Sequence, residues 1–292
     1  MSTHSPHHAP FKLAGIMGWP VAHSRSPSIH NHWIKQHGLN GAYVLLPTDP
    51  ANLKDALKGL SALGFAGCNL TIPHKVMALP LVDRINDTAR RMGAINTIVV
   101  EADGSLSGYN NDGFGYIQSL LDAKPDWQAN AGPVLVMGAG GAARAVIVSL
   151  AEKGAKDIRV CNRTDSHAQD LVSEFQADFV QNLGTKIIAT PWAERHNAVA
   201  DVALLVNTTS QGMGSNPPLD VNLTKLPVTA LVSDVVYIPR LTPLLAAAQA
   251  RGNPIAGGLG MLLHQARPAF NAWFGVMPEV TPALLEAVNA TF

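Results

Sequence analysis

The feature that most constrains how this chain can fold is a short apolar run that ends in a glycine-rich turn. Residues 133–145 have the sequence Pro-Val-Leu-Val-Met-Gly-Ala-Gly-Gly-Ala-Ala-Arg-Ala, in which Gly138, Gly140 and Ala143 match a dinucleotide-binding fingerprint. Gly138 permits a tight turn, Gly140 lets the backbone approach a pyrophosphate, and Ala143 lets the following helix pack closely on the strand. The helix amino terminus then faces the phosphates. The residues expected to bind the cofactor here are Gly138, Gly140, Gly141 and Ala142.

Apolar runs alternate with helical stretches on both sides of this turn, which predicts an α/β protein. In the second half we expect a Rossmann-type doubly wound domain with strands at 133–137, 157–161, 202–207 and 231–236, and helices at 142–153 and 166–176. In the first half we expect a parallel α/β layer with strands at 13–17, 42–46 and 67–71, and helices at 28–37 and 52–63.

A stretch rich in Gly and Asn, residues 105–115, predicts a hinge between two domains. The first domain is expected to cover residues 11–110, and the nucleotide-binding domain residues 111–258. The tail from 259 to 292 is helical in pattern, and we expect it to return to the first domain and complete it.

Composition excludes several classes of function. Lys plus Arg equals Asp plus Glu at 21 each, so no net field draws the chain to nucleic acid or to an anionic membrane. No apolar run approaches the length of a membrane span, and the amino terminus does not resemble a signal peptide. Cys68 and Cys161 lie among apolar residues, as reduced buried thiols do, and this favours a cytoplasmic protein. His4, His7 and His8 are expected in a disordered tail, and no metal site is expected.

The residues that follow the second strand of the nucleotide-binding domain indicate whether the cofactor carries a 2′-phosphate. NAD-binding domains place an acidic residue there, whereas this chain has Asn162, Arg163 and Thr164. An arginine presents a planar fork to a 2′-phosphate, which favours NADP. Asp165 would repel that phosphate if it turned inward, so NAD or dual use stays open.

The loop that follows the first strand holds alternate hydroxyls at Ser24 and Ser26 before Pro27. Both can donate to a carboxylate beside the amino terminus of a helix. Taken alone, helix capping is the more common role for such serines.

This loop and six further segments, in order, resemble the motifs of the shikimate dehydrogenase family. The segments are Gly-Trp-Pro-Val-Ala-His-Ser-Arg-Ser-Pro-Ser-Ile-His-Asn at 18–31, Gly-Cys-Asn-Leu-Thr-Ile-Pro-His-Lys at 67–75, Gly-Ala-Ile-Asn-Thr at 93–97, Gly-Tyr-Asn-Asn-Asp-Gly at 108–113, Asn-Thr-Thr-Ser-Gln-Gly-Met at 207–213, Asp-Val-Val-Tyr-Ile-Pro at 234–239 and Gly-Leu-Gly-Met-Leu-Leu-His-Gln-Ala at 258–266.

The resemblance implies NADP-dependent hydride transfer to a ring carbonyl of a small hydroxylated carboxylate. It implies that Ser24 and Ser26 hold the carboxylate, near Tyr237. It makes Lys75 the catalytic acid and Asp112 its partner. Thr71, Asn96, Asp112 and Gln265 are then expected to bind ring hydroxyls, and Met213, Gly258 and Met261 to surround the nicotinamide.

Some readings stay open beside the resemblance. Met213 and Met261 are equally typical of a plain core. His23, His74 and His264 have no carboxylate partner evident from their spacing, and we expect structural roles for them.

Two departures from the family pattern bear on specificity. Asn111 stands where the family has Thr before its catalytic Asp, which puts the ring substituents in question. His167 stands where NADP-specific relatives have a further basic residue.

The alternatives are therefore a quinate or quinate/shikimate dehydrogenase, a paralogue acting on an aminated analogue, or a regulator that binds the ligand without catalysis. A glutamyl-tRNA reductase would need a nucleophilic Cys in an amino-terminal domain and a long basic helix, and neither is present. We expect a small-molecule substrate and a monomer or a homodimer.

Overall fold

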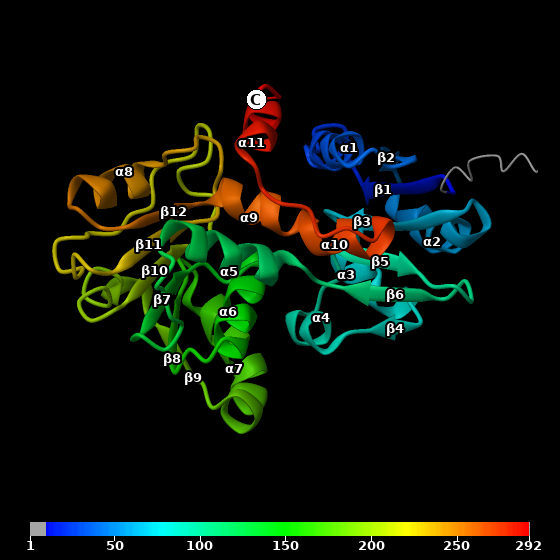
Figure 1. Ribbon diagram of the computed structural model, residues 1–292. Coiled ribbons are helices and arrows are strands. Elements are labelled where there is room, and N and C mark those ends of the chain that lie inside the picture. The colour runs from blue at the N-terminus through cyan, green and yellow to red at the C-terminus, as the bar shows by residue number, and fades with distance from the viewer. Residues whose placement is uncertain (1–9, 292) are drawn as a thin grey trace, which may run out of the picture. The chain divides into compact units, whose positions relative to one another are not determined.

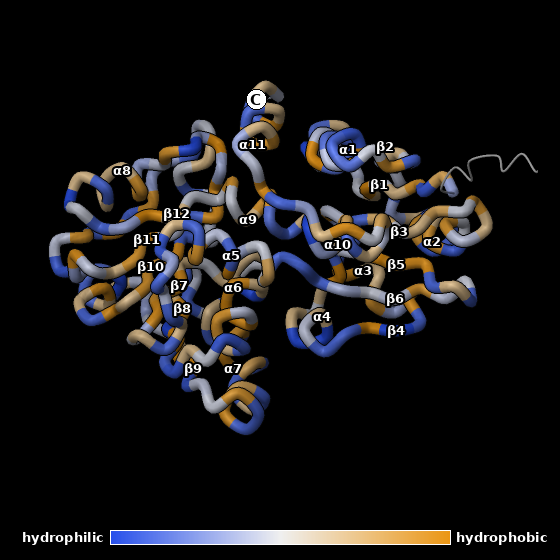
Figure 2. Tube along the Cα trace, viewed as in Figure 1, coloured by the Kyte–Doolittle hydropathy of each residue, from blue (hydrophilic) through white to orange (hydrophobic). Residues whose placement is uncertain are grey.

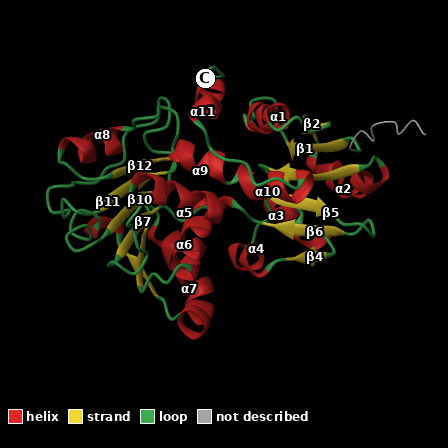
Figure 3. Cartoon of the chain, viewed as in Figure 1, coloured by secondary structure: helices red, strands yellow, loops and turns green. Residues whose placement is uncertain are grey.

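The computed structural model describes residues 10–291, so the expectation for His4, His7 and His8 lies outside the described residues. The chain forms two compact units, each an alternation of helices and strands (Figure 3). The first unit ends at Asn111 and resumes at Ala266, and the second is Asp112–Gln265. The α/β class expected from the sequence is confirmed in both units.

The second unit contains a six-stranded sheet in which every pair of neighbours is parallel. Its strands are β7 (Val134–Met137), β8 (Asp157–Cys161), β9 (Lys186–Thr190), β10 (Leu204–Asn207), β11 (Leu231–Asp234) and β12 (Ile255–Gly257). Their order across the sheet is β12-β11-β10-β7-β8-β9. The chain moves outward from β7 in one direction and then from β10 in the other, which is the doubly wound arrangement with its switch point between β7 and β10.

Helices connect these strands and cover the sheet. They are α5 (Asp112–Ala123), α6 (Gly141–Glu152), α7 (Asp165–Asp178), α8 (Pro243–Ala250) and α9 (Gly258–His264), with short turns at Phe179–Leu183 and Trp192–Glu194. Helices α5 and α6 lie side by side (Figure 1). Because strands of a parallel sheet are covered on both faces, β7, β10 and β11 are buried along their whole length, and β7 and β10 are largely hydrophobic (Figure 2).

Helix α9 belongs to the second unit, although the tail from residue 259 was expected in the first. Small residues explain this, because they let α9 approach α5 closely. A Cβ at Gly115 would lie 2.5 Å from the Met261 carbonyl oxygen, and one at Gly260 would lie 2.9 Å from Cβ of Ser119. The tail therefore changes units between Gln265 and Ala266, and only α10 (Ala266–Phe274) and α11 (Pro282–Asn289) join the first unit.

The first unit also contains a six-stranded sheet, but this sheet is mixed rather than parallel as expected. Strands β1 (Lys12–Gly18), β2 (Gly41–Pro47) and β3 (Phe65–Leu70) are parallel, whereas β5 (Thr97–Val100) runs antiparallel to both β3 and β6 (Leu106–Tyr109); β4 is Arg84–Ile85. The order is β2-β1-β3-β5-β6-β4. The sequence did not predict a mixed sheet, because apolar spacing does not report strand direction. The stretch 105–115 contains β6 and the start of α5, and the boundary between the two units lies within it, after Asn111.

The helices of the first unit pack on opposite faces of this sheet. They are α1 (Ser26–Gln36), α2 (Leu53–Ala62), α3 (His74–Met77) and α4 (Asp87–Met92), with single turns at Pro50–Asn52 and Leu79–Leu81. The apolar face of α2 shares a core with Cys68 and Leu70 of β3. On the other face, Trp33 of α1 and Phe270 of α10 pack edge to face, with ring centroids 5.4 Å apart.

Trp273 anchors α10 to the sheet, because its indole Nε1 donates a hydrogen bond of 2.9 Å to the Ile98 carbonyl oxygen. Gly67 makes room for the indole: a Cβ there would lie 2.3 Å from that nitrogen, and its φ of +153° suits only glycine. The register between β1 and β3 shifts beside this glycine. The return of the carboxyl-terminal helices to the first unit is therefore confirmed for α10 and α11.

His30 is fully buried in this aromatic cluster. Its ring stacks on that of Tyr43 with centroids 4.1 Å apart, and Trp33 meets it edge-on. Burial lowers the pKa of His30 to about 3, opposed in part by the side chain of Asn69. The imidazole is therefore neutral wherever the fold is intact at ordinary pH.

We expect His30 to make the protein less stable as the pH falls. Below about pH 6.5 the unfolded chain binds a proton at this histidine, whereas the folded protein does not. The unfolding free energy therefore falls as the pH is lowered from about 6.5 to about 3. Replacing His30→Phe keeps the aromatic stack and should reduce the loss of unfolding free energy between pH 7 and 5 by about 2 kcal/mol. Urea unfolding at several pH values measures this. The exposed His37, changed to Gln, is the control, and equal pH dependence in wild type and His30→Phe would contradict the assignment.

Candidate active site

The direction of the strands gathers the expected substrate residues of the first unit at one edge of its sheet. The parallel strands β1 and β3 end there, and β5 begins there because it is antiparallel to β3, with Asn69 opposite Thr97. Ser24 and Ser26 follow β1, Thr71 and Lys75 follow β3, and Asn96 immediately precedes β5. Residues far apart in sequence thus come to a single edge.

Ser24 and Ser26 form the entrance to α1. The Ser24 Oγ accepts the backbone N–H of Ser26 at 3.3 Å, and Arg25 at the N-cap provides no side-chain cap. Capping is therefore part of the role of Ser24. Ser26 is buried, and hydrogen bonding with its side chain partly offsets the rise that burial causes in the pKa of Tyr43.

Lys75 lies on the short helix α3, which two contacts fix in place. The preceding His74 is fully buried, and its Nε2 lies 2.8 Å from the Thr48 carbonyl oxygen, so this nitrogen carries the hydrogen and donates. The carbonyl oxygen of Lys75 accepts the N–H of Ile95 at 2.8 Å. The structural role expected for His74 follows: it holds the turn on which Lys75 stands.

Asn96 is the centre of a buried polar cluster. Its Oδ1 accepts the Thr97 hydroxyl at 2.8 Å and the N–H of Asn111 at 3.0 Å. Asn69 donates from Nδ2 to the Asn96 carbonyl and to Thr97 Oγ1, and accepts the Tyr43 hydroxyl at 2.7 Å. Two protein donors therefore already occupy Oδ1 of Asn96.

The side chain of Asn111, the departure from the family pattern, takes part in the same cluster. Its Nδ2 donates to Thr97 Oγ1 at 3.0 Å. The amide is thus directed at the protein's own scaffold.

In the second unit, the expected cofactor residues lie at the carboxyl edge of the parallel sheet. Gly138 follows β7 with φ of +114°, and a Cβ there would lie 2.5 Å from Thr208 Oγ1. Cβ atoms at Gly140 and Gly141 would meet nothing within 4 Å, and α6 has no side-chain cap at Gly140. The first turn of this three-turn helix therefore leaves open space in front of its N–H groups, which fits a pyrophosphate.

The loop after β8 carries Arg163 and Thr164 on its exposed side. Asn162 shapes this loop by donating from Nδ2 to the Thr164 carbonyl at 2.8 Å. Asp165 begins α7, and its Oδ1 accepts the backbone N–H of Trp192 at 2.8 Å. One oxygen of the carboxylate that could repel a 2′-phosphate is thus hydrogen-bonded to the protein backbone.

The remaining expected residues also emerge at this edge or at the contact of α5 with α9. Met213 follows β10, Tyr237 follows β11, and Gly258 begins α9, where a Cβ would lie 2.2 Å from the Val235 carbonyl. Met213 is 47% exposed, so it is no core methionine. Met261 is half-buried.

Asp112 starts α5 and Gln265 ends α9. An acidic residue in the first turn of a helix is favoured by the helix dipole, which suits Asp112. The Gln265 Nε2 donates to the Leu262 carbonyl at 3.1 Å. Next to it, His264 has a carboxylate partner after all: its Nε2 lies 2.6 Å from Asp122 Oδ2, one helix away. Sequence spacing could not show this partner, because the two residues are 142 positions apart.

Sequence reasoning assigned no role to Asn207 and Asp234, although both stand in the quoted motifs. Asp234 is 1% exposed, and burial raises the pKa of its carboxyl against hydrogen bonds from Thr242, Val236 and Asn207. A lone acidic residue at the end of an apolar strand was the signal that could have identified it.

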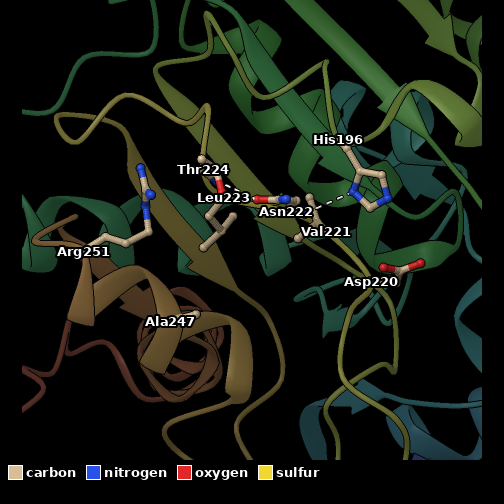
Figure 4. Close-up of a pocket in the computed structure, with 8 residues that line it drawn as sticks. All are labelled: His196, Asp220, Val221, Asn222, Leu223, Thr224, Ala247 and Arg251. Atoms are coloured by element: carbon tan, nitrogen blue, oxygen red, sulfur yellow. Dashed lines mark hydrogen bonds between the residues drawn. The ribbon is translucent and has the colours of Figure 1, made fainter.

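A cavity of about 710 Å³ opens elsewhere in the second unit, near α8 (Figure 4). It is lined by His196, Asp220, Val221, Asn222, Leu223, Thr224, Ala247 and Arg251, none of which is an expected site residue. The Asn222 N–H donates to His196 Nδ1, and Thr224 donates to Asn222 Oδ1. Its polar groups serve the loop itself, and we assign the cavity no role.

Within residues 10–291, no helix combines the length and the apolar character needed to cross a membrane. The same residues include no group of three or more His, Cys, Asp or Glu side chains placed to hold a metal ion.

Three family models match the chain in order. They are the shikimate dehydrogenase substrate binding domain at residues 16–98, shikimate / quinate 5-dehydrogenase at 122–210, and the shikimate 5'-dehydrogenase C-terminal domain at 258–286. The chain belongs to the shikimate dehydrogenase family. The resemblance seen in the sequence motifs is thereby confirmed.

Relatives within this family include the shikimate dehydrogenase (NADP(+)) of Rhodospirillum rubrum, 50% identical over 95% of this chain and 96% of that protein. Among solved structures, shikimate 5-dehydrogenase of Thermus thermophilus in complex with NADP(H) and shikimate is 34% identical, with a TM-score of 0.81 over 96% of this chain and all of that one. Quinate dehydrogenase of Corynebacterium glutamicum in complex with NAD is 29% identical, with a TM-score of 0.87 over the same shares.

Proposed function

We propose that this protein is an NADP-dependent shikimate dehydrogenase that reversibly reduces 3-dehydroshikimate to shikimate in aromatic amino-acid biosynthesis, in the cytoplasm. The observation that carries the proposal is the meeting of Ser24, Ser26, Thr71, Lys75 and Asn96 at one sheet edge in a chain 50% identical to an enzyme of that name. The first unit binds the substrate and the second binds NADP. The active form is a monomer or a homodimer.

The substrate carboxylate is held by the hydroxyls of Ser24 and Ser26, with Tyr237 beside it. The ring hydroxyls are bound by Thr71, Asn96, Asp112 and Gln265. The Asn96 side chain is held by the hydrogen bonds that its Oδ1 accepts from Thr97 and Asn111.

Lys75 and Asp112 act on the proton. The Lys75 ammonium stabilises the negative charge that develops on the carbonyl oxygen and then donates a proton to that oxygen. Asp112 keeps the ammonium in place. Asp112 directly follows Asn111 in the chain, and the hydrogen bonds of Asn111 to Asn96 and Thr97 support its position. In the reverse direction, the neutral amine accepts the proton.

NADP supplies or accepts the hydride when it is bound. The open turn at Gly140, Gly141 and Ala142 receives its pyrophosphate, and Asn162, Arg163 and Thr164 receive its 2′-phosphate. Met213, Gly258 and Met261 surround the nicotinamide. Asp165 directs its Oδ1 at the backbone N–H of Trp192, which favours Arg163 as the residue that meets the phosphate.

A quinate dehydrogenase that uses NAD is the second candidate, favoured by the structural similarity to the Corynebacterium glutamicum enzyme. Asn111 gives it less support than the sequence suggested, because its amide is bonded to Thr97. A regulator without catalysis would not need both Lys75 and Asp112.

Initial rates with shikimate and with quinate, each with NADP and with NAD, test the proposal on the unmodified protein. We expect the highest kcat/KM for shikimate with NADP. A higher value for quinate with NAD would replace the proposal by the second candidate, and no turnover with any pair would favour a regulator.

Changing Lys75→Ala should lower kcat for shikimate by about a hundredfold or more, because the lost interaction strengthens only as charge develops. The KM for shikimate should change by about threefold at most. Steady-state kinetics measure both constants. Lys58→Ala, an exposed lysine on α2, is the control, and near-normal turnover in Lys75→Ala would remove Lys75 from the chemistry.

Changing Arg163→Ala should weaken NADP binding by about ten- to a hundredfold, the usual strength of a charge-assisted hydrogen bond, and should leave NAD nearly unchanged. His167→Arg should increase the preference for NADP. Dissociation constants and kcat/KM for both cofactors measure these effects. Lys186→Ala, at the opposite edge of the sheet, is the control. Equal weakening of NADP and NAD in Arg163→Ala would show that this residue does not recognise the phosphate.

A further inference from the structure

Two segments of the second unit carry residues on which the proposed function depends. Residues 207–214 begin with the last residue of β10 and include Met213, beside the nicotinamide. Residues 234–242 begin with the last residue of β11 and include Tyr237, beside the substrate carboxylate. The two segments are joined directly by two backbone hydrogen bonds, from the N–H of Gly214 to the carbonyl of Ile238 at 3.1 Å and from the N–H of Val235 to the carbonyl of Asn207 at 3.0 Å.

Asp234, the first residue of the second segment, accepts hydrogen bonds from both segments. Its Oδ1 accepts Asn207 Nδ2 and the backbone N–H of Val236, each at 3.0 Å. Its Oδ2 accepts the Thr242 hydroxyl at 2.7 Å. One carboxylate is thereby bonded to the start of the first segment and to both ends of the second.

Asn207 extends this network along the segment that leads to Met213. Its Nδ2 also donates to the Gln211 carbonyl at 3.1 Å, and its Oδ1 accepts both the N–H and the hydroxyl of Thr209. Asn207 is fully buried and uses both of its polar atoms twice. The turn before Met213 is therefore built on a side chain that Asp234 orients.

Thr242 closes the network at its other end. Its Oγ1 accepts the N–H of Leu245 at 3.3 Å and so caps α8. Gly212 packs against it, since a Cβ there would lie 3.7 Å from Cβ of Thr242. The beginning of α8, the Tyr237 segment and the Met213 segment thus meet around one acidic group.

A buried carboxylate is costly to desolvate, and it is retained where its hydrogen bonds are fully used. All three groups that contact Asp234 are donors, which is the arrangement that an ionised carboxylate requires. An apolar residue at this strand end would fill the space but could not hold the two segments together.

We propose that Asp234 is a positioning residue that fixes the Met213 segment and the Tyr237 segment as one block, so that the cofactor and the substrate are presented together. The inference rests on the proposed function, which names the roles of Met213 and Tyr237. Asp234 is assigned no contact with either ligand and acts through the Asn207 and Thr242 side chains and the Val236 backbone that it holds. Its loss should therefore affect the binding of both ligands at once.

The test compares Asp234→Ala, Asp234→Asn and Asn253→Ala. Asn253 is the matched control, because it is a buried side chain that donates to the Pro227 and Ala230 carbonyls near the opposite end of β11. We measure unfolding free energy, the dissociation constant for NADP by titration without substrate, and KM for shikimate and kcat. The constants are compared only among variants whose unfolding free energy shows them to be fully folded, because a partly unfolded population raises the apparent dissociation constant.

Asp234→Ala should raise both the NADP dissociation constant and the shikimate KM by roughly tenfold or more and lower kcat, as expected when reacting groups are misplaced by a fraction of an ångström. Asp234→Asn should recover part of this, because its oxygen can still accept from Asn207 and Val236. Asn253→Ala should lose stability but keep both constants within about twofold of wild type.

Unchanged constants in a folded, less stable Asp234→Ala would overturn the inference, as would a change in only one of them. If that variant does not fold, Thr242→Val and Thr242→Ser replace it: Val should raise both constants, whereas Ser, which keeps the hydroxyl, should not. The unmodified protein separates this result from the proposed function. Absent turnover with shikimate and NADP would refute the function, whereas normal turnover with unaffected variants would refute only the role of Asp234.

Discussion

Strand direction is the constraint on which the rest of this structure depends. Where parallel strands are joined by crossover connections, all the loops that follow the carboxyl ends of the strands emerge at the same edge of the sheet. In the second unit this brings Gly138, Arg163, Met213 and Tyr237 to one edge, although they lie on four different loops. In the first unit the antiparallel β5 adds Asn96 to the edge formed by β1 and β3.

Buried polar clusters then hold each edge in one shape. Asn96 accepts from Thr97 and Asn111 in the first unit, and Asp234 accepts from Asn207 and Thr242 in the second. In a low-dielectric interior, such bonds are strong when complete and costly when broken, so each cluster favours a single arrangement of its loops. Both clusters lie at the strand ends where ligands are expected.

Close backbone contact fixes the position of two helices relative to each other. Gly115 and Gly260 let α5 and α9 touch, so the start of α5 and the end of α9 belong to one packed pair. Both points at which the chain passes between the units, after Asn111 and after Gln265, lie at the ends of this pair. The proposed partners of the substrate at these points, Asp112 and Gln265, are thus carried by a single piece of scaffold.

The sequence alone determined what depends on local geometry and on motif spacing: the glycine turn before α6, the alternation of strands and helices, the family, and the residues expected at the site. It could not determine the direction of β5, the Asp122 partner of His264, the bond from Asn111 to Thr97, or the donor that occupies Asp165. Each of these joins residues distant in the chain, and periodicity reports only neighbours one turn or one pleat away. Only tertiary packing decided which donor each buried oxygen would meet.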